Sequence, residues 1–156
     1  NRSSFYSEYE ENIPDYKIII LGLAMAGKTA LLTRYQHNFY DDRGTATISI
    51  DYNIKKVKMH GIGTTIIGQE VYRAIVSAHY KGSDACIIVY DVSEPRTFSE
   101  VDYYCNQIKD FVPDALVYIV GCKTDKQKKV QDDEITKKYQ GAKHFLTSSK
   151  TNQGVH

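Results

Sequence analysis

Residues 22–29 read G-x-x-x-x-G-K-T, a pattern that is typical of phosphate-binding loops. An apolar run at 17–21 comes directly before them, and a helix-like run at 30–35 directly after. In such a loop the glycines let backbone N–H groups surround phosphate oxygens. Lys28 then supplies positive charge to the β- and γ-phosphates, and the Thr29 hydroxyl reaches Mg²⁺. The amino end of the following helix adds its dipole to the same anion site. The pattern predicts nucleotide binding; a glycine turn beside a solvated lysine is the alternative.

Apolar runs alternate with amphipathic stretches along the rest of the chain. The runs at 17–21, 85–90 and 116–120 are apolar throughout, as expected of strands buried on both faces of a parallel sheet. A further strand is expected over 48–59, doubling back at a turn at 60–61. This order predicts an α/β, P-loop NTPase fold, which is a doubly wound, mostly parallel sheet with one antiparallel edge strand, flanked by helices. Ligands bind such sheets at the carboxyl ends of the strands.

Helical spacing of apolar residues and the end of the phosphate loop predict four helices, over 28–38, 71–81, 97–111 and 132–140. The third is the clearest, because Thr97-Phe98-Ser99-Glu100 fits a capping box at its start.

Length and charge indicate one domain and exclude several classes of partner. The chain has 156 residues, and its net charge of +1 comes from 20 basic and 19 acidic residues, which offers no attraction for nucleic acid. We find no secretory leader, no apolar run of membrane-spanning length and no lipid-acceptor cysteine at the C-terminus. We expect a cytosolic domain over 15–156, preceded by a polar, tyrosine-rich arm over 1–14.

Four further segments match motifs of the Ras-family small GTPases in order and spacing, and within that superfamily the chain resembles a Rab. Residues 68–70, GQE, resemble the end of D-x-x-G-Q-E, and residues 89–93, VYDVS, resemble the fourth strand of Rabs. Residues 122–125, CKTD, resemble N-K-x-D, and residues 147–150, TSSK, resemble T-S-A-K. Each motif alone is weak evidence for the family, but the four motifs in this order after a phosphate loop are a specific resemblance. The resemblance covers about residues 15–156 and implies binding of GTP or GDP with Mg²⁺.

The resemblance also implies which residues form the site. Nucleotide would be bound by Ala24, Met25, Ala26, Gly27, Lys28, Thr29, Ala30, Tyr40, Thr47, Gly68, Cys122, Lys123, Asp125, Ser148, Ser149 and Lys150. Thr29 and Thr47 would hold Mg²⁺, while Lys28 and Gln69 would act in catalysis, with Gln69 orienting the attacking water. Plainer explanations stay open: a β-prone threonine at Thr47, and a glutamine that merely precedes a helix at Gln69.

Asp125 offers a chemical account of guanine specificity. A carboxylate can accept hydrogen bonds from a ring N–H and an exocyclic amine, a pair of donors that guanine has and adenine lacks. By resemblance, the stem of Lys123 covers one ring face, Tyr40 lies against the base, and a backbone N–H near Ser149 meets the guanine oxygen. A surface ion pair between Lys123 and Asp125 is the alternative.

Four positions depart from the family pattern, three of them in the phosphate loop and the segment at 122–125. Cys122 replaces an asparagine whose amide ties this segment to the phosphate loop, and a thiol is a poor substitute, which predicts weaker affinity and faster exchange. Ala24 and Met25 stand where glycines are usual. A methyl group at Ala24 would crowd the approach of the catalytic glutamine and of a partner's arginine to the γ-phosphate, which predicts slow hydrolysis and a weak response to activating proteins.

Thr65 stands where relatives have an aspartate that holds Mg²⁺ through water. The stretch from the turn at 60–61 to Gly68 is also shorter than in relatives by about five residues, roughly one strand. We therefore expect the sequence as given to lack part of the third strand, and also the final helix, which would begin near Asn152. Either residues are missing from it, or this protein has lost the aspartate and part of its second switch. We favour the first account, because a lost strand would leave a hole in the core.

The resemblance predicts a Rab-like guanine-nucleotide-binding switch with slow GTP hydrolysis that acts in vesicle trafficking and is cytoplasmic, in association with vesicle membranes. Effectors, an exchange factor and a GTPase-activating protein would bind its switch segments. Two alternatives stay open. Thr65, Ala24 and Cys122 favour a pseudo-GTPase scaffold that binds nucleotide weakly or constitutively. A P-loop ATPase or kinase would use Asp91 to hold its metal, but would leave the segment at 122–125 without a role.

Overall fold

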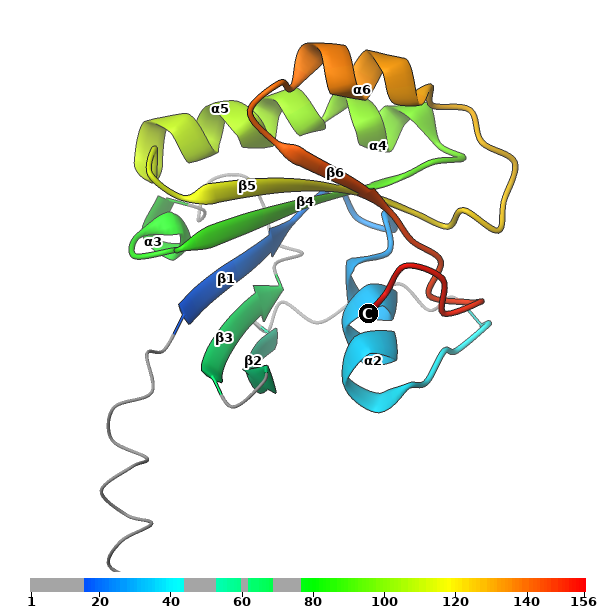
Figure 1. Cartoon of the computed structure of the whole chain (residues 1–156), viewed down its shortest axis with the longest axis horizontal. Coiled ribbons are helices and arrows are strands. Elements are labelled where there is room, and N and C mark those ends of the chain that lie inside the picture. The colour runs from blue at the N-terminus through cyan, green and yellow to red at the C-terminus, as the bar shows by residue number, and fades with distance from the viewer. Residues whose placement is uncertain (1–15, 44–52, 60–61, 69–76) are drawn as a thin grey trace, which may run out of the picture.

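The computed structural model of the chain describes residues 16–43, 53–59, 62–68 and 77–156. The strands in this part of the chain are β1 (Tyr16–Leu21), β2 (Asn53–Met59), β3 (Ile62–Gly68), β4 (Ala85–Asp91), β5 (Leu116–Cys122) and β6 (Lys143–Leu146). They form one sheet in the order β2-β3-β1-β4-β5-β6 (Figure 1). The strands predicted at 17–21, 85–90 and 116–120 are thus confirmed.

The sheet is mostly parallel. β1, β4 and β5 lie side by side in its middle and run parallel, as their continuous apolar sequences predict. β3 is parallel to β1, and β6 is parallel to β5. At the far edge β2 runs antiparallel to β3. The strand predicted over 48–59 is present from Asn53 onward; residues 48–52, the turn at 60–61 and the arm at 1–14 lie outside the described residues.

The structure describes a third strand in the chain as given, and the prediction that the sequence lacks part of this strand stays a prediction. β3 has seven residues, pairs with β1 from Thr64 to Gly68, and pairs with β2 along its whole length. β2 ends at Met59 and β3 begins at Ile62, and the two strands pair antiparallel from end to end. The shorter segment therefore reduces the length of the hairpin, and the run at 62–68 fills the place beside β1 that would otherwise be empty.

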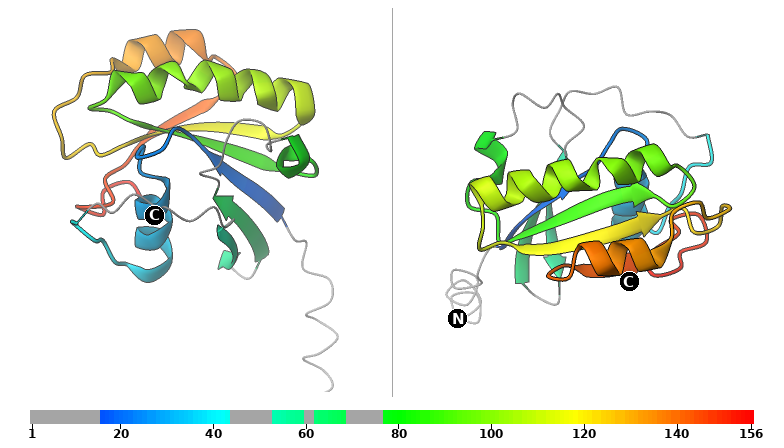
Figure 2. Two further views of the ribbon diagram at one scale, coloured as in Figure 1. Left: turned by 180° about the vertical axis from the view of Figure 1, so that it is seen from behind. Right: turned by 90° about the horizontal axis from the view of Figure 1, so that it is seen from above.

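Helices cover both faces of the sheet, as Figures 1 and 2 show. They are α2 (Lys28–His37), α3 (Ser77–Tyr80), α4 (Pro95–Ser99), α5 (Val101–Phe111) and α6 (Asp132–Lys138). α2 packs on one face, over a core cluster that includes Ile20, Leu32 and Val89. α5 and α6 pack on the other face, where Val101 and Ile135 join the larger cluster. None of the described helices combines the length and apolarity needed to cross a membrane.

The helix predicted over 97–111 is divided, and the predicted capping box is wrong. α4 begins at Pro95, and the side chain of Glu94 caps it by accepting a hydrogen bond from the Arg96 backbone N–H. Proline suits the first helical position because its ring fixes φ and it lacks an N–H group. Thr97 is consequently inside the helix, and its buried hydroxyl accepts a hydrogen bond from the Asp91 N–H at 2.8 Å.

β6 has no counterpart among the predicted strands. It is only four residues long, and its two hydrophobic side chains, Phe145 and Leu146, are exposed, so neither an apolar run nor an alternating pattern marks it.

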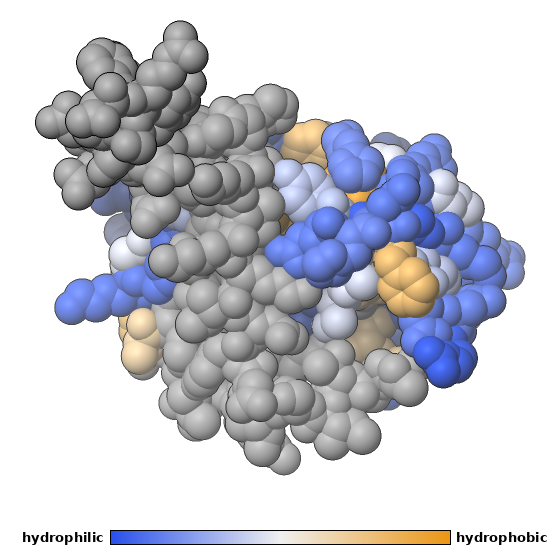
Figure 3. Space-filling view, turned by 90° about the horizontal axis from the view of Figure 1, so that it is seen from below, coloured by the Kyte–Doolittle hydropathy of each residue, from blue (hydrophilic) through white to orange (hydrophobic). Residues whose placement is uncertain are grey.

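On the face seen from below in Figure 3, the hydrophobic side chains of the described residues are separated by hydrophilic ones.

Gly121 in β5 provides a test of this packing. A Cβ atom there would lie 2.6 Å from the Tyr90 hydroxyl oxygen and 2.8 Å from Leu146 Cδ2. Tyr90 cannot easily move, because it is fully buried and its hydroxyl is 2.9 Å from His144 Nε2. We expect Gly121→Ala to lower the free energy of unfolding by about 1–3 kcal/mol in urea denaturation. Gly141→Ala is the control, since a Cβ there meets nothing within 4 Å. Equal stabilities of the two variants would contradict this packing.

Candidate nucleotide-binding site

The phosphate loop connects β1 to α2 and depends on two glycines. Gly22 has φ +146° and Gly27 has φ +114°, backbone conformations that side chains rarely allow. Both glycines also face neighbouring strand ends, Gly22 the backbone of β4 and Gly27 the Cys122 side chain of β5. A Cβ at Gly22 would be 2.3 Å from the Val89 carbonyl oxygen, and one at Gly27 would be 3.1 Å from Cys122 Cβ. The loop is therefore pressed onto the ends of β4 and β5, which positions it at the carboxyl edge of the sheet.

Lys28 is the first residue of α2, and its relative exposure is only 3 %. Its ammonium group donates hydrogen bonds to the carbonyl oxygens of Gly22 and Leu23, both at 2.8 Å. The side chain therefore curls back over its own loop and places a positive charge there, beside the amino end of α2. Positive charge and helix dipole coincide at this point, which is the arrangement that favours an anion.

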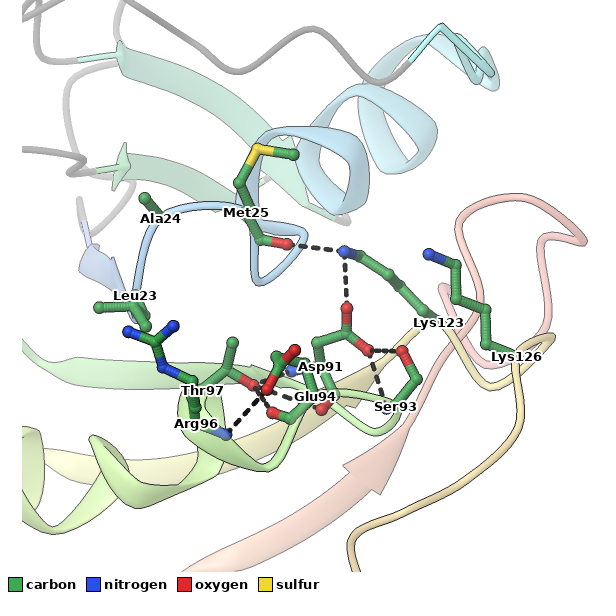
Figure 4. A pocket seen from close by; sticks show the side chains of 10 residues that line it. All are labelled: Leu23, Ala24, Met25, Asp91, Ser93, Glu94, Arg96, Thr97, Lys123 and Lys126. Carbon is green, nitrogen blue, oxygen red and sulfur yellow. Dashed lines mark hydrogen bonds and ion pairs between the residues drawn. The ribbon is translucent and has the colours of Figure 1, made fainter.

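A second lysine joins the phosphate loop to the strand ends beside it. Lys123 follows β5, and its Nζ donates to the Met25 carbonyl oxygen at 2.7 Å. The same Nζ is 2.7 Å from Asp91 Oδ2 at the end of β4 (Figure 4). Burial alone raises the pKa of Asp91, but hydrogen bonds from Lys123 and Ser93 and the charge of Lys123 outweigh it, so the pKa lies below its ordinary value. Asp91 is thus a carboxylate committed to Lys123, which argues against its use as a metal ligand in a kinase-like site.

The segments after β5 and β6 meet beside this lysine. Ser148 is fully buried, and its hydroxyl donates to Asp125 Oδ1 at 2.6 Å. The backbones of the two segments are joined as well, because the Thr124 N–H donates to the Thr147 carbonyl oxygen at 3.2 Å. Asp125 itself is exposed, and its second oxygen receives no hydrogen bond from the described residues. The carboxylate is therefore held in place through one oxygen, on an exposed side chain.

Arg34 on α2 ties the last of these segments in place, and sequence reasoning missed it. Its Nε donates to the Ser149 carbonyl oxygen at 2.6 Å, and its Nη2 donates to the Lys150 carbonyl oxygen at 3.1 Å. Lys150 in turn bonds Asp42 at 3.3 Å, close to the half-buried Tyr40 in sequence. A local sequence pattern cannot predict this contact, because Arg34 and Ser149 are 115 residues apart in the chain.

Cys122 lies beneath the phosphate loop and is 1 % exposed. Its Sγ accepts a weak hydrogen bond from the Thr147 hydroxyl at 3.4 Å, and burial raises the pKa of the thiol to about 11. Cys122 belongs to the same core cluster as Ala26 of the loop, and a Cβ atom at Gly27 would lie 3.5 Å from its Sγ. The thiol therefore packs as a small apolar group where the related motif has an amide.

A cavity of about 430 Å³ borders the outer side of the phosphate loop. Its walls come from Leu23, Ala24 and Met25 on one side and from the chain between Asp91 and Thr97 on the other, as Figure 4 shows. Ala24 is exposed, and the Lys123 side chain crosses between the two walls.

The structure brings most of the predicted site residues to one edge of the sheet. The phosphate loop with Ala26, Thr29 and Ala30, the segment at 122–125 and the segment at 148–150 lie together there. Gly68 lies at the carboxyl end of β3, where its backbone pairs with Ile20. Thr47 and Gln69 lie outside the described residues. Thr65 is within β3, opposite Lys17.

This fold and this loop define an α/β protein with a phosphate-binding loop between its first strand and the following helix. A sequence model of the Ras family matches residues 17–156, so the chain belongs to the Ras family of small GTPases. Proteins of this family are generally GTP-binding switches that hydrolyse GTP, bind Mg²⁺ and interact with exchange factors, activating proteins and effectors.

Among curated proteins, the chain is similar to several Rab proteins. It is 33% identical to Ras-related protein Rab-18 of Lymnaea stagnalis, over 95% of this chain and 78% of that protein. It is 31% identical to Ras-related protein RabC of Dictyostelium discoideum, over 90% of this chain and 78% of that protein. It is 30% identical to Ras-related protein Rab-21 of Mus musculus, over 90% of this chain and 68% of that protein.

The lowered pKa of Asp91 predicts a pH dependence of stability. The folded chain binds this proton less tightly than the unfolded chain, so the stabilising contribution is complete above the ordinary carboxyl pKa of 3.8 and is lost as the pH falls through the lower folded-state value. We expect Asp91→Asn to lower the free energy of unfolding at neutral pH by about 2 kcal/mol. Urea denaturation should show this gap narrowing as the pH falls below 3.8.

The control is Asp114→Asn, because Asp114 is exposed and forms no hydrogen bond or ion pair through its side chain with the described residues. A gap between wild type and Asp91→Asn that stays constant across the acid range would contradict the ion pair.

Proposed function

We propose that this protein is a Rab-like guanine-nucleotide switch with slow GTP hydrolysis that acts in vesicle trafficking. The observation that carries the proposal is the meeting of the phosphate loop with Lys123 and Asp125 at one sheet edge, through the 2.7 Å contact between Lys123 Nζ and the Met25 carbonyl oxygen. A site that binds phosphate at one end and a base at the other needs both segments in contact. The membership of the chain in the Ras family and its likeness to Rab proteins support it.

At the phosphate end, Lys28 and the backbone N–H groups of 24–30 bind the phosphates, and Thr29 with Thr47 holds Mg²⁺. The buried ammonium group of Lys28 fits this role, because it lies over its own loop at the amino end of α2, and a phosphate is a stronger hydrogen-bond acceptor than the carbonyl oxygens of Gly22 and Leu23. Gln69 orients the water that attacks the γ-phosphate. Contacts of Thr47, Gly68 and Gln69 with the γ-phosphate order the switch segments that effectors read.

At the base end, Asp125 accepts hydrogen bonds from the ring N–H and exocyclic amine of guanine. Ser148 holds the carboxylate in place through its 2.6 Å hydrogen bond. The Lys123 stem and Tyr40 cover the ring, and the backbone of Ser149 and Lys150 meets the guanine oxygen. Discrimination against adenine follows because the wrong base leaves these polar groups unpaired.

Calorimetry with purified protein tests this assignment. We expect heat of binding with GDP and with GTP and none with ADP. In Asp125→Asn the acceptor becomes an amide whose NH₂ donates, so GDP affinity should fall by at least about 100-fold. The same variant should gain affinity for xanthosine diphosphate, which has a carbonyl group in place of the amine. Absence of heat with either guanine nucleotide would refute the proposed function.

The exposed Ala24 supports slow hydrolysis. Its methyl group occupies space on the loop where a catalytic glutamine and a partner's arginine would approach the γ-phosphate. We expect Ala24→Gly to raise the single-turnover rate of GTP cleavage by about tenfold, which corresponds to about 1.4 kcal/mol of barrier. Ala142→Gly, between α6 and β6, is the control. A wild-type rate that equals the rate of Ala24→Gly would contradict the steric argument.

A pseudo-GTPase scaffold is the second candidate, and the packing of Cys122 as an apolar group favours it, since the amide contact of the related motif is absent at this position. Titration with GDP in the presence and absence of Mg²⁺ separates the two. A switch enzyme loses affinity when the metal is removed, whereas a scaffold does not depend on it.

A further inference from the structure

We propose that Asp91 is a positioning residue that holds Lys123 against the phosphate loop and thereby slows the release of bound nucleotide. The inference rests on the proposed function, because it concerns the lifetime of the same guanine-nucleotide complex. Neither the phosphate nor the base is expected to touch Asp91. The residue acts through Lys123.

The Asp91 carboxylate is fixed on both of its oxygens. Oδ2 forms the ion pair with Lys123 Nζ at 2.7 Å. Oδ1 accepts hydrogen bonds from the Ser93 N–H at 2.8 Å and from the Ser93 hydroxyl at 2.6 Å. The Asp91 N–H donates to the Thr97 hydroxyl, so the backbone is held as well. The Asp91 side chain is 7% exposed, and an anchor this rigid and buried costs little entropy when it orders a flexible lysine.

Lys123 uses this anchor to bridge two loops. Its ammonium group contacts Asp91 on one side and the Met25 carbonyl oxygen on the other, as Figure 4 shows. Met25 has φ +66° and Lys123 has φ +65°, left-handed conformations that cost free energy for residues other than glycine. Strained backbone persists where surrounding contacts hold it, and here the two strained residues are bonded to each other.

The link that Lys123 forms between Asp91 and Met25 is more important in this chain than in relatives, because Cys122 stands where they have an asparagine. Among the described residues, the Cys122 thiol forms no hydrogen bond to the phosphate loop, and its weak hydrogen bond comes from the Thr147 hydroxyl. The hydrogen bond from Lys123 to Met25 is therefore a polar link between the base segment and the phosphate loop. Without Asp91, the ammonium group would keep one neutral partner and gain access to water, and the link would weaken.

Nucleotide release requires the base segment and the phosphate loop to separate. Loss of the Asp91 charge should therefore accelerate dissociation, and it should do so equally for GDP and GTP, because the bridge contacts the loop and not the γ-phosphate. The association rate should stay nearly unchanged, since the bridge acts after the nucleotide is bound.

The experiment measures dissociation of fluorescently labelled GDP and GTP by stopped flow. We expect Asp91→Asn to raise both dissociation rates by about tenfold or more. Asp102→Asn is the matched control, since it removes the carboxylate of a lysine ion pair, with Lys138, that lies between α5 and α6. In a Lys123→Ala background, Asp91→Asn should add nothing further, and Asp91→Glu should restore part of the wild-type lifetime.

Unchanged dissociation in a folded Asp91→Asn protein would overturn the inference, and so would an effect that adds fully to that of Lys123→Ala. Should Asp91→Asn not fold, Ser93→Ala provides the test, because it removes one hydrogen bond from Oδ1 at a half-buried position. It should raise dissociation a few-fold, and an unchanged rate would count against the proposal. Failure of the wild type to bind any guanine nucleotide would instead refute the proposed function.

Discussion

The site depends on one constraint, which is that parallel strands bring their carboxyl ends to the same edge of the sheet. β1, β4, β5 and β6 are parallel neighbours, so the segments that follow them converge although they are far apart in the chain. The glycines Gly22 and Gly27 allow the phosphate loop to lie directly on the ends of β4 and β5. The polar contacts between different segments of the site follow from this closeness, including the hydrogen bond from Lys123 to Met25.

Two lysines place positive charge at this edge, and they differ in the kind of hydrogen-bond acceptor that each contacts. Lys28 is buried at the amino end of α2 and donates hydrogen bonds to the carbonyl oxygens of Gly22 and Leu23. Lys123 is paired with the Asp91 carboxylate and also donates to the Met25 carbonyl oxygen. The first lysine therefore places positive charge within its own loop, whereas the second joins two segments that follow different strands.

Continuous apolar runs made β1, β4 and β5 predictable, since burial on both faces leaves little room for polar residues. β6 and the division between α4 and α5 were not predictable. β6 is short and mostly exposed, and Pro95 starts the helix before the apparent capping box. The contacts made by Arg34 and Asp91 were beyond sequence reasoning, because each joins residues whose closeness exists only after the sheet has formed. The nucleotide motifs themselves were visible, since their chemistry is local.

The short hairpin between β2 and β3 changes how Thr65 should be understood. Counting back from Gly68 places Thr65 where relatives have a metal-holding aspartate, but the register sets Thr65 opposite Lys17 and Gly68 opposite Ile20. At about 3.3 Å per residue, Thr65 lies roughly 16 Å along the sheet from the level of Gly22. A carboxylate at this point of the strand would be far from the phosphate loop. In this register the identity of residue 65 therefore matters less than the length of the hairpin, which sets where along β1 the whole strand is paired.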